Sequence, residues 1–419
     1  MPISFGSGAG QYPVIIHPGQ QRCIFAIEDA SYGTPSTSTA KTFLEPVTTI
    51  TTAIQRTPYE ANEYIGVPAT LFDMIETTHH STVTISVPWR SNGIAAWALS
   101  AMMGSSLGGA TDVATTPTGW PALTGGQVAH LITPNNANNV CNTITIWHDA
   151  GDGGGSSVFT GVRGLLQMSA CTVESIRFTF TPNTAVTAEI TLQGNFPIFR
   201  QVASGSTGIQ NGPTVTPTKL SGADATYKAT RMMGFQGQSA YFLIRTSAQN
   251  TTVYANKILS ADMTITRTVE VIESPYSQTP TYFLPGPLSV TGTMNMLFDG
   301  LGDLTNTYPV NAGSNVNTDL TLSNSIYQDY LNFKRTGTSA NPNELRYIDN
   351  DNNGFDFTFW PIKWTSFGLN TGAQSLQVNA GFTSFNDLSL AAPNSGTSKI
   401  SSIQNVSIVN NVPATTMIA

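Results

Sequence analysis

Apolar and small hydroxyl residues alternate along several segments of the chain. In the first of these segments, Ile50 and Ile54 point to one face. Thr49, Thr51 and Gln55 point to the other face. An alternation with a period of two predicts a β-strand that has one buried face and one solvated face. The chain is therefore predicted to be mainly β.

The predicted strands occur twice, in the same order. The first copy contains FAIEDASYGTPSTS, VTTITTAIQRTPY, STVTISVPW and VESIRFTFTPNTAVTAEITLQGNF. The second copy contains YFLIRTSAQNTTVY, MTITRTVEVIESPY, LSVTGTMNM and WTSFGLNTGAQSLQVNAGFTSF. A repeat of this length indicates a duplicated fold unit. We interpret the unit as a building block of an assembly rather than as an enzyme.

The apolar positions of these strands are expected to be buried in both copies. Beyond the first strand, they are in the first copy Val83, Ile85, Val87, Ile176, Phe178, Phe180, Val186, Ile190 and Leu192. In the second copy they are Ile265, Val269, Leu288, Val290, Met294, Met296, Phe367, Leu369, Leu376, Val378 and Phe382.

One short helix is predicted after the second strand of each copy. In the first copy, IAAWALSAMM follows Ser91 and Asn92 and ends at Gly104, which indicates a capped amphipathic helix. In the second copy, residues 326–331 follow a cap at Asn324. Each helix would cover the apolar face of a curved sheet. The first apolar run is too short to span a bilayer, so no membrane insertion is expected.

These elements predict two tandem modules, each a β-sandwich or half-barrel with one helix. The expected boundaries are an N-terminal arm 1–22, module 1 at 23–200, a linker 201–222, module 2 at 223–390 and a C-terminal tail 391–419. The tail contains the apolar run ISSIQNVSIV, which has the pattern to add a strand to the sheet edge of a neighbour.

The low content of charged residues limits the classes of function that the chain is expected to have. Charged residues make up 10% of the 419 residues, and the net charge is −7. Tight binding to nucleic acid needs clustered Lys and Arg, so this balance argues against it, but it permits a surface that DNA slides past. The three cysteines, Cys23, Cys141 and Cys171, form no CxxC pair and are expected to be buried, reduced thiols. The N-terminus MPISFGSGAG shows no secretory signal.

Few motifs suggest chemistry. Residues 349–357, DNDNNGFDF, fit the first half of a calcium-binding loop, but the closing position is Trp360 rather than Glu, and a turn explains these residues equally well. His79-His80 is expected at a loop tip. The chain lacks the motifs GxxxxGK[ST], GxGxxG and HExxH. We therefore predict no catalytic residue, no cofactor and no metal site.

Aromatic residues gather in one stretch, namely Phe355, Phe357, Phe359, Trp360 and Trp364. They would form either a platform for a sugar or a base, or part of a packed core. The packed core is favoured because Lys363 is the one basic residue among these aromatics, and a platform that binds nucleic acid would need several. The first keeps open an alternative function, an all-β virion module that recognises a carbohydrate or a receptor.

With the repeat in view, the chain resembles the major tail tube proteins of long-tailed bacteriophages. The strings MTITRTVEVIESPY and FLPGPLSVTGTMNMLF are similar to the paired wall strands of that family, and VESIRFTFTPNTAVTAEITLQGNF is similar to the end of its tube domain. The first module departs from the pattern in TPYEANEYIGVPATLFDMIETTHH, which lacks the Pro-Gly-Pro entry.

The resemblance implies a virion protein of the tail, assembled in the host cytoplasm, whose stacked rings form a tube for DNA. Relatives with one tube domain form hexameric rings, and those with two form trimeric rings with pseudo-sixfold symmetry. It also implies that the tape measure protein and the tail terminator or tip proteins are partners. Double-stranded DNA would pass without specific contacts, through a β-barrel built by all subunits.

Barrel geometry supports three chains per ring. Strands about 4.8 Å apart and tilted by about 40° give a 24-stranded barrel roughly 45–50 Å across, which leaves a bore of roughly 40 Å. Shared strand parity then predicts the residues that face the bore. They are Thr49, Thr51, Gln55, Thr82, Thr84, Thr264, Thr266, Glu270, Thr291 and Thr293.

Two long loops, 57–80 and 273–287, are expected to join the wall strands at one end of the barrel. We expect them to contact the next ring, or the neighbour in the same ring, because aromatic residues dominate interface energetics. The predicted anchors are Tyr59, Tyr64, Phe72, Tyr276 and Tyr282. The alternative is that these aromatics cover their own module.

Overall fold

The structure is a computed structural model. It describes residues 22–28, 32–33, 42–61, 73–90, 93–104, 111–113, 120, 122–123, 127–134, 142–149, 163–181, 184–195, 197–202, 241–243, 258–297, 326–327, 329–333, 343–348, 352–359, 361–372, 375–385 and 403–410. The described chain is mainly β, as predicted.

Eight antiparallel strands form one continuous wall, and each half of the chain supplies four of them. In sheet order they are β3 (Thr49–Ala61), β4 (Asp73–Pro88), β9 (Thr187–Gly194), β8 (Arg163–Phe180), β12 (Ile258–Ile272), β13 (Tyr282–Leu297), β17 (Gln377–Ser384) and β16 (Ile362–Asn370). We call this set the wall. The two halves meet where β8 pairs with β12, and we call that junction the internal seam.

Two of the four strand pairs that correspond between the halves of the wall have equal lengths. β4 and β13 both have 16 residues, and β9 and β17 both have 8. The β8–β9 pair has an irregularity between Val173 and Ser175, and the β16–β17 pair has one between Trp364 and Ser366. Such bulges change the twist of a strand locally, so matched bulges indicate matched geometry. These strands of the second half of the wall therefore repeat the lengths and the bulge of their counterparts in the first half.

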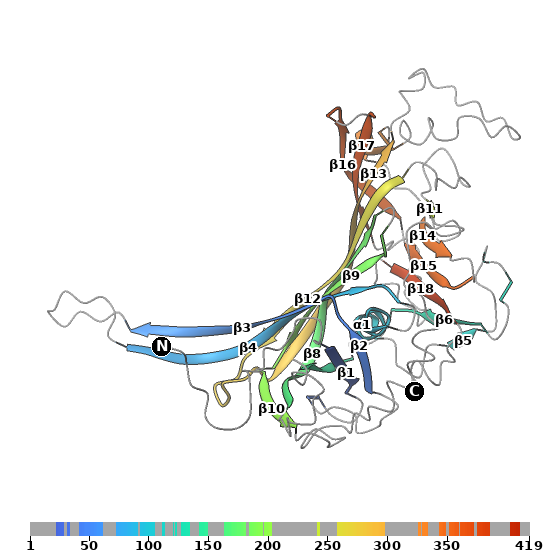
Figure 1. The fold of residues 1–419 in the computed structure, drawn as a ribbon. Helices are drawn as coiled ribbons and strands as arrows, with labels where there is room; N and C mark the ends of the chain where they lie inside the picture. The colour runs from blue at the N-terminus through green and yellow to red at the C-terminus, as the bar shows by residue number, and fades with distance from the viewer. Residues whose placement is uncertain are drawn as a thin grey trace, which may run out of the picture.

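A second sheet covers one side of the wall (Figure 1). It has six strands, which in sheet order are β11 (Tyr241–Leu243), β14 (Asn343–Ile348), β15 (Gly354–Phe359), β18 (Ile403–Asn410), β6 (Val128–Ile132) and β5 (Thr111–Val113). Four shorter strands extend the wall sheet beside β8, namely β7 (Ile144–Asp149), β1 (Arg22–Ile27), β2 (Thr42–Pro46) and β10 (Ile198–Val202).

The C-terminal strand lies within its own chain. β18 pairs with β15 on one side and with β6 on the other. The expectation that this tail adds to the sheet edge of a neighbour is therefore wrong for this structure. Because β15 comes from the second half of the chain and β6 from the first, β18 joins the two halves across the six-stranded sheet.

The core lies between the two sheets. Trp89, at the end of β4, packs 4.7 Å from Phe178 on β8 and 5.2 Å from Phe355 on β15, measured between ring centroids. Phe357 packs 5.2 Å from Phe178. Edge-to-face and tilted contacts at these distances are favourable for aromatic rings. The second half of the chain thus covers the wall of the first half, and the two share one hydrophobic core.

The helix α1 (Ile94–Met103) lies beside the wall, with Gly93 at its N-terminus and Gly104 in the left-handed conformation at its C-terminus. The helix end expected at Gly104 is confirmed. The expected amphipathic pattern is wrong, because all ten residues of α1 are buried. The second predicted helix occurs as helical residues 326–327 and 329–331, and its proposed cap, Asn324, lies outside the described residues.

Several local predictions need correction. The strands continue into both expected loops, since β3 ends at Ala61 and β13 begins at Tyr282. His79 and His80 lie inside β4, not at a loop tip. Ile54, Leu369 and Leu376 are exposed in the single chain, although they were expected to be buried. These errors share a cause, because local patterns do not show where a strand stops or whether a neighbour covers it.

Candidate functional surface: the open face and free edges of the wall

One face of the wall is turned away from the core and carries mostly hydroxyl side chains. Residues paired across adjacent strands lie on the same face of a sheet. One paired row runs through all eight strands, and it consists of Thr49, Ser86, Glu189, Arg177, Thr264, Thr291, Thr383 and Lys363. Ile50 and Ile265 lie on the opposite, buried face. We call the hydroxyl-rich side the open face.

The ten residues predicted to line a bore all lie on wall strands. Exposed side chains are those of Thr49, Thr51, Gln55, Glu270, Thr291 and Thr293. Half-buried side chains are those of Thr82, Thr84, Thr264 and Thr266. None of the ten belongs to the core, and that they face a bore stays a prediction.

The open face also carries an ionic cluster that the sequence interpretation missed. Arg177 forms a salt bridge of 3.4 Å with Asp262, and it lies opposite Glu189 in the β8–β9 pair. Thr179 Oγ1 donates a hydrogen bond of 2.7 Å to Asp262 Oδ1. The arginine thus has an acidic residue on each side, which weakens its attraction for a phosphate. The alternation that predicted the buried residues of the strands also places Arg177, Glu189 and Asp262 on the opposite face, so it could have identified this cluster.

Both outer edges of the wall lack a second partner strand among the described residues. β3 pairs with β4, and β16 pairs with β17. On the core side of these edges, Ile54 is 46% exposed and Leu369 is 53% exposed. A sheet edge with unpaired backbone groups and exposed apolar side chains is a template for pairing with another chain.

The turn between β12 and β13 rests on a strand of the first module. His79 N–H donates a backbone hydrogen bond of 2.9 Å to the carbonyl of Gln278, and Thr78 Oγ1 donates one of 2.6 Å to Glu273 Oε1. Phe283 N–H donates to the hydroxyl oxygen of Tyr32 at 3.0 Å. Burial raises the pKa of Tyr32 to about 12, so this phenol stays neutral at physiological pH. The hairpin of one module is thereby fixed on its neighbour.

The predicted anchor residues are placed in part. Tyr276 is 97% exposed at the β12–β13 turn. Tyr282 is exposed and also contacts the Tyr32 ring at 5.6 Å between centroids. Tyr59 lies in β3, while its side chain, Tyr64 and Phe72 lie outside the described residues.

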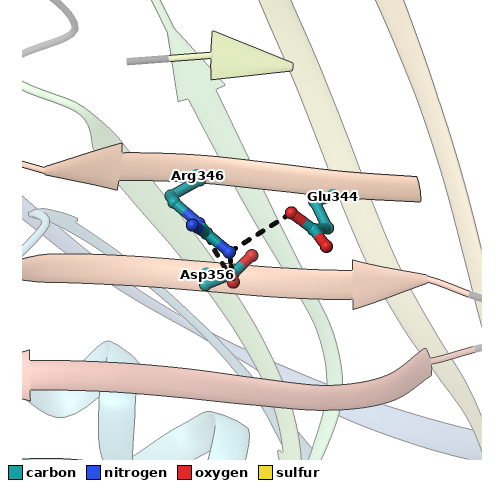
Figure 2. Close-up of polar contacts among 3 residues, drawn as sticks. All are labelled: Glu344, Arg346 and Asp356. Carbon is teal, nitrogen blue, oxygen red and sulfur yellow. Dashed lines mark hydrogen bonds and ion pairs between the residues drawn. The ribbon is translucent and has the colours of Figure 1, made fainter. Parts of the chain in front are cut away.

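A buried ion pair lies in the six-stranded sheet (Figure 2). Arg346 Nη2 is 2.6 Å from Asp356 Oδ2 and 3.2 Å from Glu344 Oε2. The guanidinium also lies 5.6 Å from the centre of the Trp120 ring. Burial raises the pKa of Asp356 to about 6, although Arg346 acts in the opposite direction. The cluster joins β14 and β15 to the segment before β6, so it has a structural role in holding the covering sheet.

Other candidate sites receive no support. Phe355, Phe357, Phe359 and Trp364 are buried, so the platform interpretation is wrong for these four, and Trp360 lies outside the described residues. Within the described ranges, no three His, Cys, Asp or Glu side chains gather as metal ligands would. Asp349 and Asp351 of the calcium-like string fall outside those ranges.

Cys23 and Cys171 are buried thiols outside any disulfide of the described residues, as expected, and Cys141 lies outside those residues. Burial is the main cause that raises the pKa of the Cys171 thiol well above its usual range, so that thiol is unreactive. Among the described segments, no helix is both long and apolar enough to cross a membrane.

Taken together, the described strands form a β-wall with a polar open face and with two outer edges that lack a second partner strand among the described residues. A family model of phage tail tube proteins matches residues 19–359, which is most of the chain. The chain therefore belongs to the phage tail tube protein family, and it is a structural component of the virion tail. No curated protein matches it.

Proposed function

We propose that three copies of the chain close into a ring whose wall strands form one 24-stranded barrel. The open face of each copy lines the bore, and stacked rings form the conduit through which double-stranded DNA passes. The role is structural and non-catalytic. The tape measure protein and the tail terminator or tip proteins are the further partners.

The internal seam carries this proposal. Inside one chain, the closing hairpin of module 1 already pairs with the first strand of module 2. Repeating that junction between copies, with six modules in all, closes the ring without a new kind of contact. Six copies would supply 48 strands and a ring about twice as wide, far more than a duplex roughly 20 Å across requires.

The open face fits a bore for DNA. It consists mainly of short hydroxyl side chains, and Arg177 is paired with Asp262. A duplex would meet few free cations there, so its phosphates would find little to bind. A surface of this kind favours passage over retention.

The β12–β13 turn suggests how the other hairpin is used. In the chain, the module 2 hairpin rests on Thr78 and His79 of module 1. The matching β3–β4 hairpin has no preceding module in its own chain on which to rest in the same way. It would rest on module 2 of the adjacent copy or on the next ring, with Tyr59, Tyr64 and Phe72 as anchors. Tyr276 and Tyr282 would serve the same role from the β12–β13 hairpin.

Cryo-electron microscopy of the purified protein tests the proposal. We expect tubes or stacked rings with three chains per ring and Thr51 and Thr291 toward the axis. A ring of six chains, or a bore lined by the Ile50 face, would contradict it. A chain with residues 62–72 replaced by a short turn should keep its circular dichroism spectrum and fail to polymerise. Normal tubes from that truncation would remove the hairpin from the assembly contacts.

A further inference from the structure

We propose that β3 of one copy pairs with β16 of the next copy in the register that β12 and β8 adopt inside the chain. This inference rests on the proposed ring and specifies its partner strand and its alignment. It places Ile54 opposite Phe367 and Thr51 opposite Asn370.

The first strands, β3 and β12, are equivalent. The β3–β4 pair has an irregularity between Thr57 and Pro58, and the β12–β13 pair has one between Arg267 and Val269. The letters before these points are IQRT at 54–57 and ITRT at 265–268. Aligning these letters also aligns the ends of the strands, Ala61 and Ile272. Ile54 of the free edge is therefore the counterpart of Ile265.

The hairpin strands, β8 and β16, are equivalent too. Their bulges fix the alignment, because Ser175 and Ser366 follow matched irregularities. With this alignment Ile176 corresponds to Phe367 and Thr179 corresponds to Asn370. The partner strands β9 and β17 then coincide from end to end.

Transfer of the internal register gives the seam between copies. Inside the chain, Ile265 lies opposite Ile176, Met263 opposite Phe178, and Asp262 opposite Thr179. The corresponding pairs between copies are Ile50 with Thr371, Thr51 with Asn370, Thr52 with Leu369, Ala53 with Gly368, Ile54 with Phe367, and Gln55 with Ser366.

The side chains at the free edges fit this register. Ile265 and Phe178 are fully buried at the internal seam. Their counterparts Ile54 and Leu369 are exposed at the two free edges. In the proposed register these two apolar side chains lie on the same face, beside Thr52 and Phe367, and are removed from water. A shift by one residue would bring the core face of one strand against the open face of the other.

The two seams also differ in charge. Arg177 and Asp262 form the ion pair of the internal seam. Their counterparts are Gly368 and Thr51, which carry no charge. The seam between copies therefore has no ion pair at these positions, and it relies on backbone hydrogen bonds and apolar contact.

Disulfide formation tests the register. Thr51→Cys with Asn370→Cys places two cysteines opposite each other between copies, and we expect covalent multimers from assembled tubes under mild oxidation. Gln55→Cys with Asn370→Cys is the out-of-register control, since Gln55 lies four residues, about 13 Å, further along the strand. That separation exceeds the reach of a disulfide. Each single variant controls for the native thiols.

An internal pair calibrates the geometry. Thr179→Cys with Asp262→Cys occupies the equivalent positions at the internal seam, and it should close within one chain. Closure there, without multimers from the T51C/N370C pair in normal tubes, would overturn the register. Multimers from the Q55C/N370C pair instead would overturn it as well. If T51C/N370C does not fold, Thr52→Cys with Leu369→Cys tests the same alignment on the other face.

Microscopy separates this inference from the proposed function. Tubes that lack the in-register crosslink refute only the β3–β16 register. A wild-type protein that forms no rings or tubes refutes the proposed assembly and the seam together.

Discussion

Arg177 on β8 and Asp262 on β12 form an ion pair of 3.4 Å across the internal seam, on the open face of the wall. Both side chains are partly exposed, at 53% and 36%. The pair therefore differs from Arg346 and Asp356, whose side chains are almost completely buried. This difference in burial determines how much each ion pair contributes to the free energy of unfolding.

Removing the exposed arginine should have a small effect. Surface ion pairs contribute about 0–1 kcal/mol, so Arg177→Ala should change the free energy of unfolding by less than about 1 kcal/mol. Arg346→Ala leaves a buried carboxylate uncompensated and should cost about 3–5 kcal/mol. Urea unfolding of both variants measures the difference. Equal losses would show that the internal seam depends on its ion pair.

Asp356 should make stability depend on pH. Its pKa is about 6 in the folded chain, against 3.8 for the ordinary group, so the folded state binds its proton more tightly. The free energy of unfolding should therefore fall as pH rises from about 4 to about 6, and this contribution should be level above pH 6.

Asp356→Asn removes this titration. Relative to the wild type, the variant should gain up to about 3 kcal/mol between pH 4 and pH 6. Urea unfolding across this pH range measures the difference, and Asp262→Asn on the open face is the matched control. A constant difference between D356N and the wild type would contradict the assignment.

Gly292 and Phe382 should behave as a matched pair. A Cβ at Gly292 would overlap the Phe382 ring, and the matching positions in module 1 hold Val83 opposite Leu192. Gly292→Val should therefore destabilise the wall by about 1–3 kcal/mol through overpacking. The double variant G292V/F382L copies the module 1 pair and should recover most of the loss. Additive losses in the double-mutant cycle would show that the two sites are independent.

Glu28 should be important for the left-handed backbone conformation of β8 at Ala170. Its carboxylate accepts hydrogen bonds from Thr145 Oγ1 at 2.5 Å and from the backbone N–H of Ala170 at 2.7 Å. Ala170 has a φ of 54°, a left-handed conformation that is unfavourable for a residue with a Cβ. Glu28→Gln should cost about 2–3 kcal/mol, because hydrogen bonds to a charged acceptor are strong.

The control for the Glu28 variant is Glu273→Gln. Glu273 accepts its hydrogen bond from Thr78 at an exposed site. This change should stay within about 0.5 kcal/mol, as surface substitutions generally do. Thermal unfolding of the two variants is sufficient, and an equal shift in both would refute the role of Glu28.

The alternation of residues predicted much of the wall from the sequence. It placed Ile50 and Ile265 on the buried side, and it predicted a repeat whose halves contain strands of equal length, β4 with β13 and β9 with β17. Alternation is a property of the strand itself, since successive side chains point to opposite faces. The aromatic run at 355–364 was correctly favoured as core for the four described residues.

Tertiary structure decided what local pattern does not contain. Arg267 occupies an apolar position of β12 and is buried, because its guanidinium donates to the carbonyl of Met102 at the end of α1 and its Nε donates to that of Gly286. A helix C-terminus presents unpaired carbonyls and favours a cation, but only the folded chain brings it to β12. The position of β18 between β15 and β6 depends on the same kind of long-range pairing. The sequence thus determined which face each strand buries, and the fold determined which partner each face and edge meets.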